Sequence, residues 1–510
     1  MVGGVLVVVW IASLVALAQR HEGPDRASGQ AVVSDGAPGM HEGDEWQTVY
    51  LKAERIGYLH LAKRRLGGDS GGWKIAYEME LDLQVMKTSQ KVRTTLEAVL
   101  DDELTVVEFD FALDGGVGGQ MSARGTVKGR TVDVELKTGG HVTAKTFDLP
   151  IEPRLAVTNK ALLAHQGLEV GKSFEISFFD PSTMGQRTVV IEVIAKEKVH
   201  VMGKSHDAFV LEQDIDGMVL RAWVTPAGDV LQEELPLGLL AVRETEEEAR
   251  YGMGEKLLMP GSVGQRIPKD DAPGQDLLEL TAPRLIGELP SDASELRRLV
   301  VEFEPSLQGS FKLEGGRQSM DGERLTIVRD ELPVGASIPD PASSELSEAG
   351  REALQSELLV QSDHPAIIAR AREIVGNVKD GLVIARRLAD WVHRKLVKVN
   401  VVGIPSALET LTALRGDCNE HTTLFAALAR ASGIPTRINV GMARVEDRFY
   451  YHAWPEVLLE GSWLNIDPTW GQFPADVTHI RFVQGGLQKQ LEMFKVIGTL
   501  RAVRVVEQTR

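Results

Sequence analysis

The chain has 510 residues, more than one ordinary hydrophobic core accommodates, so its length predicts two or three domains. Apolar residues make up 43% of it and charged residues 25%, as in ordinary globular proteins. The formal net charge of −17 argues against nucleic acid as a partner, because nucleic acid binding needs a basic surface that displaces counterions.

The N-terminal residues 1–18 are apolar from Val2 onward and end in Ala16-Leu17-Ala18, a small-x-small pattern typical of signal cleavage. The run is near the lower limit of about 17 residues for a membrane span. No basic segment precedes it, so a cleaved signal peptide and an uncleaved N-terminal membrane anchor are both open. Either one predicts an exported protein, periplasmic or extracellular, and the second would hold it at a membrane. Residues 19–44 are polar and indicate a tether.

Residues 45–250 show the alternation of an antiparallel β-domain. The clearest run is WKIAYEMELDLQV, residues 73–85, in which every second residue is apolar and most residues between are polar. Such alternation indicates a strand with one buried and one solvated face. The run ALLAHQGL, residues 161–168, predicts a short helix inside this domain. No chemical constellation occurs here, so we expect a scaffold, or a surface that binds a lipid or a protein.

Residues 251–345 are predicted to form a connector and a small β-module. Short apolar runs such as RLVVEFEP, residues 298–305, and RLTIVRDEL, residues 324–332, read as strands. A Pro- and Ser-rich stretch follows at residues 332–350 and marks a linker. The C-terminal domain, residues 346–510, is therefore expected to fold apart from the β-domains.

Two packing helices begin the C-terminal domain. Ser362 or Asp363 can cap the first, with Pro365 in its first turn. The second, residues 380–397, presents apolar residues at helical spacing and ends in basic residues, which suit the helix dipole. Both helices are expected to support a core rather than to carry chemistry.

Cys418 is the only cysteine, so it can form neither an internal disulfide nor a thiolate zinc site. It is a buried apolar residue, an intermolecular link or a nucleophile. Asp417 and Glu420 form a capping-box pattern, which predicts that a helix begins at Cys418. Unpaired backbone N–H groups and the positive end of the dipole stabilise a thiolate there, so a thiol pKa below the ordinary value of about 8.5 is predicted.

A proton-transfer partner for the thiolate lies downstream, in RFYYHAWPEVLLEGSWLNIDPTW. Two strand-like runs flank Glu460-Gly461, a two-residue hairpin turn. If Leu459 faces Ser462, then His452 and Asp467 are diagonal neighbours on one face of the sheet. A carboxylate in that place holds an imidazole in one tautomer. The predicted catalytic residues are therefore Cys418, His452 and Asp467, in that chain order.

The stretches GDCNEHTTLFAALARASGIPTRINVG and YYHAWPEVLLEGSWLNIDPTW resemble the transglutaminase-like core, a branch of the papain-like cysteine enzymes. The resemblance covers about residues 360–480 and places the family's nucleophile, base and orienting acid on the same Cys418, His452 and Asp467. It implies an α+β fold in which a helical layer carrying the cysteine packs on an antiparallel sheet, preceded here by antiparallel β-rich domains.

The activity that the resemblance implies is acyl transfer from a protein or peptide carboxamide through a thioester. An amine acceptor gives transglutamination, whereas water gives deamidation or proteolysis, and the residues leave these outcomes open. A cysteine peptidase of the same fold and a non-catalytic envelope assembly protein are the alternatives. Trp454, Trp470 and His421 are further candidates for the substrate cleft. The mechanism requires no metal or cofactor.

Overall fold

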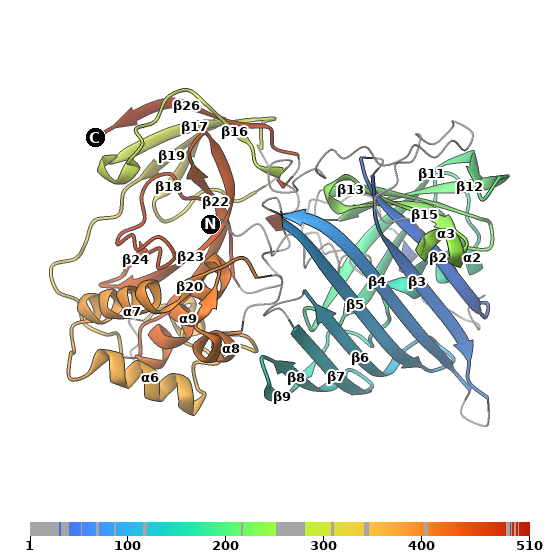
Figure 1. Ribbon diagram of the computed structural model, residues 1–510, viewed down its shortest axis with the longest axis horizontal. Helices are drawn as coiled ribbons and strands as arrows, with labels where there is room; N and C mark the ends of the chain where they lie inside the picture. The colour runs from blue at the N-terminus through green and yellow to red at the C-terminus, as the bar shows by residue number, and fades with distance from the viewer. Residues whose placement is uncertain are drawn as a thin grey trace. The chain divides into compact units, whose positions relative to one another are not determined.

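The computed structural model describes residues 30–31, 40–52, 54–67, 71–85, 88–115, 120–215, 218–250, 281–307, 311–340, 346–401, 406–485, 490, 492–493, 496–497 and 499–510. The described chain forms two compact units, one from most of the residues up to 276 and one from residues 277–510 (Figure 1). The predicted signal or anchor, residues 1–18, lies outside the described residues. Within them, no helix is both long enough and apolar enough to cross a bilayer.

The first unit is built on one sheet of fifteen strands, in the order β1-β10-β11-β12-β13-β14-β15-β2-β3-β4-β5-β6-β7-β8-β9. Nearly all of its pairings are antiparallel, as predicted for this region. Its strands are β1 (Gln30–Ala31), β2 (Gly43–Leu51), β3 (Glu54–Arg65), β4 (Trp73–Val85), β5 (Thr88–Leu100), β6 (Val106–Asp114), β7 (Gln120–Lys128), β8 (Thr131–Thr138), β9 (His141–Asp148), β10 (Ser173–Asp180), β11 (Gly185–Val201), β12 (Lys204–Ile215), β13 (Met218–Val224), β14 (Val230–Leu235) and β15 (Leu239–Glu244). Its helices are η1 (Ala156–Thr158), α2 (Asn159–His165), η2 (Pro236–Gly238) and α3 (Glu246–Arg250).

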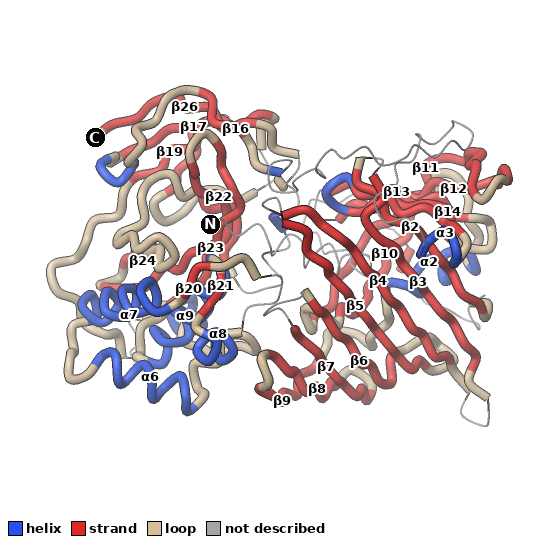
Figure 2. Tube along the Cα trace, viewed as in Figure 1, coloured by secondary structure: helices blue, strands red, loops and turns tan. Residues whose placement is uncertain are grey.

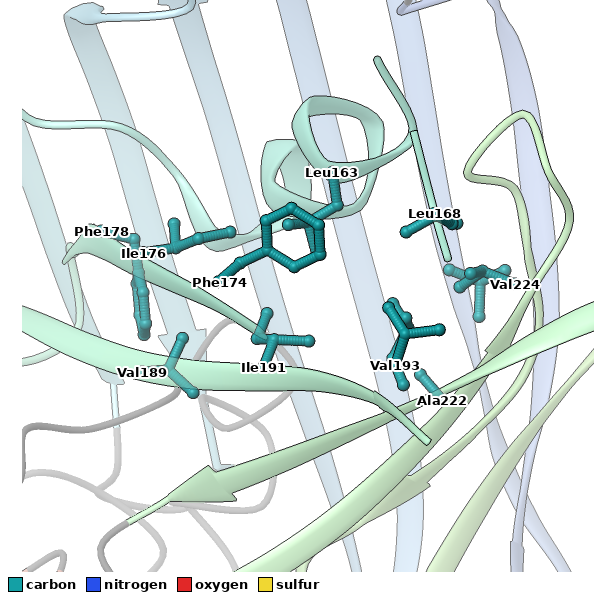
Figure 3. Packing of buried hydrophobic residues seen from close by; sticks show 12 residues of the cluster. Leu163, Leu168, Phe174, Ile176, Phe178, Val189, Ile191, Val193, Ala222 and Val224 are labelled. Carbon is teal, nitrogen blue, oxygen red and sulfur yellow. The ribbon is translucent and has the colours of Figure 1, made fainter. Parts of the chain in front are cut away.

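Apolar residues at alternate positions form the core of this unit. In β4, the side chains of Ile75, Met79 and Leu81 are completely buried, as the alternation of residues 73–85 predicts. Figure 3 shows a second part of the core, in which Phe174 of β10 and Ile191 of β11 pack below the short helix α2. That helix, which the sequence predicts, covers the sheet with Leu163.

The second unit contains a sheet of nine strands, in the order β18-β19-β17-β26-β16-β23-β22-β25, with β24 paired to β23. Its strands are β16 (Arg284–Ile286), β17 (Arg298–Glu304), β18 (Gln318–Asp321), β19 (Arg324–Val328), β22 (Thr436–Val445), β23 (Arg448–Leu459), β24 (Ser462–Asn465), β25 (Ile480–Gln484) and β26 (Ala502–Thr509), and the short β20 (Val397–Lys398) and β21 (Arg415–Gly416) pair with each other. Its helices are η3 (Ala293–Glu295), α5 (Glu348–Glu352), α6 (Pro365–Val375), α7 (Gly381–Lys395), α8 (Ala407–Ala413) and α9 (Cys418–Ala431).

The predicted small β-module does not stand apart from the C-terminal domain. β26, from the end of the chain, pairs with β17 on one side and with β16 on the other. β16 also pairs with β23, so strands from residues 284–328 belong to the sheet that the C-terminal region forms. Residues 332–340 of the Pro- and Ser-rich stretch form neither a helix nor a strand, but the composition does not reveal that the chain returns to the same sheet.

The helices form one layer against the C-terminal part of this sheet. Figure 2 shows α6, α7, α8 and α9 gathered beside β22 and β23. α9 is the central helix, because it packs on β23 and β22 and also touches α6, α7 and α8. Thirteen of its fourteen residues are buried. The α+β fold predicted for the C-terminal core is therefore confirmed, with Cys418 at the start of its innermost helix.

Candidate active site

The capping box predicted before α9 is present. The Asp417 carboxylate accepts a hydrogen bond from the Asn419 N–H at 2.9 Å, and the Glu420 carboxylate accepts one from the Asp417 N–H at 2.8 Å. These bonds satisfy N–H groups that a helix start leaves open, so the helix begins at Cys418. Thr422, one turn on, donates to the carbonyl oxygen of Ala453 at 3.0 Å and ties this end of the helix to β23.

The Cys418 thiol is completely buried against β23. The backbone N–H of Ala453, the residue after His452, interacts with the thiol. Burial and the neighbouring Asp417 carboxyl raise the pKa of Cys418 well above its ordinary value. The prediction of a lowered thiol pKa is therefore wrong for this arrangement. A dipole at a helix start favours a thiolate only where the charge is also solvated or paired, and burial removes the water that would solvate it.

The hairpin register that brings His452 toward Asp467 is the predicted one. Leu459 faces Ser462 across a two-residue turn, and the ladder runs to the pair Glu456 and Asn465. The turn residues Glu460 and Gly461 have positive φ values of 49° and 75°. A two-residue hairpin turn needs such values if its twist is to match the twist of the two strands. Beyond the ladder, the chain turns so that Asp467 points back at β23.

His452 and Asp467 make a direct, fully buried contact. Nε2 of His452 lies 2.9 Å from Oδ2 of Asp467, and neither side chain is exposed to solvent. Burial alone would raise the pKa of Asp467, but the imidazoles of His452 and His479 outweigh burial and hold it below its usual range. An ionised carboxylate only accepts hydrogen bonds, so Nε2 of His452 is the donor.

The other ring nitrogen of His452 is the free one. Within the described part of the chain, Nδ1 of His452 is buried and has no hydrogen-bond partner. In the neutral ring this nitrogen carries a lone pair, because Nε2 holds the proton. The Cys418 thiol interacts with the backbone N–H of the next residue, Ala453, so the thiol packs against the strand that carries this open nitrogen.

The close pairing of β25 with β22, the neighbour of the strand that carries His452, depends on one glycine. Gly441 of β22 pairs with His452 on one side and with Arg481 on the other. A Cβ atom at Gly441 would lie 1.9 Å from the backbone oxygen of Ile480, a distance that no real contact reaches. Glycine at this position therefore permits the spacing of β22 and β25 beside the histidine.

The three predicted cleft residues have different surroundings. Trp470 is half-buried and stacks on the His452 ring, with centroids 4.4 Å apart and planes at 16°. Trp454 is completely buried, and its ring stacks on the His452 ring with the centroids 6.1 Å apart. Its Nε1 donates to Asn465, so Trp454 belongs to the core. His421 is also buried, and its Nδ1 donates to the carbonyl oxygen of Asp417 at 2.6 Å.

His421 is held as a neutral ring. Burial lowers its pKa to about 4, and the bond to a carbonyl oxygen fixes the proton on Nδ1. Its Nε2 atom is buried and has no partner among the residues that the structure describes. Among the described residues, the site therefore contains two buried imidazole nitrogens that can accept a hydrogen bond, Nδ1 of His452 and Nε2 of His421.

Sequence reasoning missed a second imidazole on Asp467. Nε2 of His479 lies 3.1 Å from the same Oδ2 atom that contacts His452, and Nδ1 of His479 lies 3.2 Å from Oδ1 of Asp476. The only signal in the sequence is the Asp-Val-Thr-His order of residues 476–479, which lies outside any predicted strand or helix.

The loop that carries His479 is fixed by a buried arginine. Arg317, just before β18, donates to the backbone oxygens of Ala475, Asp476 and His479 at 2.7, 2.9 and 3.1 Å. Burial lowers the pKa of Arg317, and Asp330 lies 3.6 Å from the guanidinium. The N-terminal strands of this unit therefore position the loop on which Asp467 depends.

His452, Asp467 and His479 also have the donor atoms of a metal site, all within 4.8 Å of one another. Each contact with Asp467 is already a hydrogen bond of ordinary length. Hydrogen bonds therefore account for the short distances between these side chains, and we interpret the three residues as a hydrogen-bonded network.

Residues 368–468 match the Transglutaminase-like superfamily. No curated protein sequence matches the chain. Among solved structures, the chain is similar to a candidate cysteine protease from Cytophaga hutchinsonii, with 14% identity, a TM-score of 0.27, and coverage of 45% of this chain and 85% of that one. The periplasmic domain of TgpA from Pseudomonas aeruginosa, bound to ethylmercury, gives 17% identity, a TM-score of 0.24, and coverage of 40% and 96%. A β-barrel-like protein of the DUF1849 family from Brucella abortus has 12% identity and a TM-score of 0.31, and the match covers 40% of this chain and 95% of that one.

The match over residues 368–468 spans α7, α8, α9, the β22–β23 hairpin, and the residues His452 and Asp467. The predicted resemblance is therefore confirmed for this part of the chain: residues 368–468 match the transglutaminase-like superfamily.

Proposed function

We propose that Cys418, His452 and Asp467 act as a catalytic triad for acyl transfer from protein or peptide carboxamides. The observation that carries the proposal is the buried His452–Asp467 contact of 2.9 Å, which leaves Nδ1 of His452 without a partner among the described residues. Cys418 rests on the same strand, at a helix start. A nucleophile, a base and an orienting acid in this relation are the common parts of thiol acyl transferases and peptidases.

The raised thiol pKa defines how the first step proceeds. Sγ of Cys418 attacks the carbonyl carbon while Nδ1 of His452 takes the thiol proton, so a free thiolate need not accumulate. The carbonyl π electrons move to oxygen, where the Cys418 backbone N–H at the helix start donates a hydrogen bond. Collapse of this intermediate expels the amine, which receives the proton from Nδ1, and a thioester remains.

The second step returns the enzyme to its first state. Nδ1 of His452 removes a proton from the acceptor, which attacks the thioester carbonyl and releases Sγ of Cys418 as the thiol. An amine acceptor forms a new amide, and water forms a carboxylic acid. Asp467 stabilises the imidazolium that exists between the two proton transfers.

The experiment is mass spectrometry of glutamine-containing peptides after incubation with and without a primary amine. A mass gain equal to the amine minus ammonia identifies transamidation, a gain of about 1 Da identifies deamidation, and chain cleavage identifies peptidase activity. Cys418→Ser and His452→Ala are the matched variants, and each should abolish turnover while circular dichroism shows a folded chain. Turnover that persists in folded Cys418→Ser would exclude the proposed nucleophile.

One observation favours a non-catalytic assembly protein instead. The thiol is completely buried and burial raises its pKa, as expected for a structural cysteine. Labelling in the presence of candidate peptides separates the two functions. A catalytic thiol should react with a small peptide-based electrophile in the folded protein, whereas a structural thiol should react only after denaturation.

We also propose that the protein is exported, on the basis of the apolar residues 1–18 and their small-x-small ending. N-terminal sequencing of the cell-fractionated protein tests this. A chain beginning at Gln19 outside the cytoplasm supports a cleaved signal, and a full-length chain in the membrane supports an anchor. Full-length protein in the soluble cytoplasm would contradict both.

A further inference from the structure

Asp467 shares one oxygen atom between two imidazoles. Its Oδ2 contacts Nε2 of His452 at 2.9 Å and Nε2 of His479 at 3.1 Å. Its Oδ1 accepts the backbone N–H groups of Thr469 at 2.7 Å and Trp470 at 3.1 Å. The carboxylate thus has four donors, which fix both its orientation and its ionised state.

The hydrogen bonds of His479 define its protonation. Its two ring nitrogens contact two different carboxylates, Asp467 on one side and Asp476 on the other. The Asp476 carboxylate also accepts the N–H and the hydroxyl of Thr478 at 2.8 and 2.6 Å and the Gln472 amide at 2.9 Å. Because ionised carboxylates only accept, both nitrogens of His479 must donate, and a ring with two N–H groups is an imidazolium.

The charges around His479 agree with this assignment. Burial alone would lower its pKa, but the two aspartates outweigh burial and raise it. Arg317 donates to the His479 carbonyl oxygen, and its charge lies near Asp330 and also interacts with Asp476. The His452 ring stands at 63° to the His479 ring, with centroids 5.4 Å apart.

We propose that His479 is a positioning residue, whose cationic ring keeps Asp467 ionised and so keeps the proton of His452 on Nε2. This inference rests on the proposed function, because it assigns Nδ1 of His452 to the thiol. The buried site holds two carboxylates, Asp467 and Asp476, and His479 supplies the positive charge between them. Without that charge, two buried anions would face each other and one of them would take up a proton.

Protonation of Asp467 would reverse the polarity of its bond to His452. The carboxylic acid would donate to Nε2, and the ring proton would move to Nδ1. A ring that carries its proton on Nδ1 cannot accept the thiol proton, so the base would be present in the wrong tautomer. His479 therefore acts through Asp467 and His452 without touching the substrate.

The test is nitrogen NMR of protein labelled with ¹⁵N-histidine, because nitrogen shifts report the tautomer of each ring directly. The chain has twelve histidines, and difference spectra of the single variants assign the signals of His452 and His479. In the wild type, His479 should show two protonated nitrogens at pH 7 and His452 a proton on Nε2. A neutral His479 ring at pH 7 would overturn the proposal.

His479→Gln is the main variant, because an amide can still donate to Asp467 but carries no charge. Its His452 signal should move toward the Nδ1–H form, and kcat should fall by about 10²-fold with little change in KM, a smaller loss than removing an orienting carboxylate causes. An unchanged His452 tautomer in a folded His479→Gln protein would refute the mechanism.

Asp476→Asn serves as the second variant if His479→Gln does not fold. It removes one of the two negative charges that contact the His479 ring but keeps a hydrogen-bond acceptor at the same place. The His479 ring should therefore lose its second proton at a lower pH than in the wild type. An unshifted titration would refute the inference. The NMR readouts do not need a substrate, so an inactive protein with the expected tautomers would contradict the proposed function alone.

Discussion

The Gln318 side chain exchanges two hydrogen bonds with the backbone of Arg481. Nε2 of Gln318 donates to the Arg481 carbonyl oxygen at 2.9 Å, and the Arg481 N–H donates to Oε1 of Gln318 at 2.6 Å. Gln318 begins β18 and Arg481 lies in β25, which are the two ends of the strand order in the nine-stranded sheet. One buried amide thus bridges the outer strands of the unit that contains the candidate active site.

A fragment of residues 346–510 should therefore not fold by itself. It lacks β16 and β17, which flank β26, and it lacks Gln318 and Arg317. Residues 277–510, which form the compact unit, are the matched fragment and should be soluble and cooperatively unfolding. Circular dichroism and urea unfolding of both fragments check this. A stable, cooperative 346–510 fragment would show that these strands are accessory.

The alkylation rate of Cys418 should rise with pH only above the ordinary thiol range in the substrate-free protein. Burial raises the thiol pKa, so the folded state holds its proton to higher pH than the unfolded chain. The stabilisation from this difference is complete below the unfolded pKa of about 8.5 and is lost as pH rises through the folded value. Iodoacetamide kinetics followed by mass spectrometry measure the profile, and the same reaction in guanidinium supplies the reference.

An alkylation midpoint well below the denatured reference would contradict this prediction. It would indicate that a thiolate is already paired with an imidazolium before substrate binds. His452→Ala distinguishes the causes, because it should leave the high midpoint of a buried thiol unchanged but would raise the midpoint of a paired thiolate.

Replacing Arg317 by Met should destabilise the second unit by about 3 kcal/mol. The guanidinium donates to three backbone oxygens in the loop of Ala475 to His479, and its removal takes this donor from all three, although the Asp476 oxygen keeps the His479 N–H at 3.4 Å. Arg324→Met is the matched control, since its bond to Glu302 is exposed and should contribute under 1 kcal/mol. Urea unfolding measures the stability of both variants. Equal unfolding midpoints for Arg317→Met and Arg324→Met would show that the loop does not need Arg317.

Gly441→Ala should disrupt the pairing of β22 with β25, because the added methyl would collide with the Ile480 carbonyl oxygen. The loss of stability should exceed about 2 kcal/mol, and His452 should become accessible to modifying reagents. Gly67→Ala is the control, because a Cβ there meets no atom within 4 Å. Thermal unfolding compares them, and a Gly441→Ala protein as stable as the control would show that β25 can move away without cost.

Local rules predicted the elements that carry the site. The capping box at Asp417 determines where α9 begins, and the two-residue turn at Glu460 determines the parity that turns His452 toward Asp467. Both depend on residues close in the sequence. The catalytic roles themselves remain proposals.

The rest depends on contacts between distant segments. The burial of Cys418, which reverses the expected pKa shift, results from packing against β23, and no pattern around position 418 reports it. His479 and Asp476 lie in an irregular loop, where neither period of regular structure applies. Arg317 reaches that loop from about 160 residues earlier in the chain.

The place of β26 has a consequence for how this unit folds. β26 lies between β17 and β16, and its partner residues in β17 are about 200 positions earlier in the sequence. Contacts of such separation make folding slow, because a large loop must close before the pairing stabilises it. During synthesis, β16 and β17 leave the ribosome long before β26 can join them, so their edges stay open to other chains. The middle of the sheet is thus the last part to close, and the interval before closure is when the chain is most exposed to aggregation.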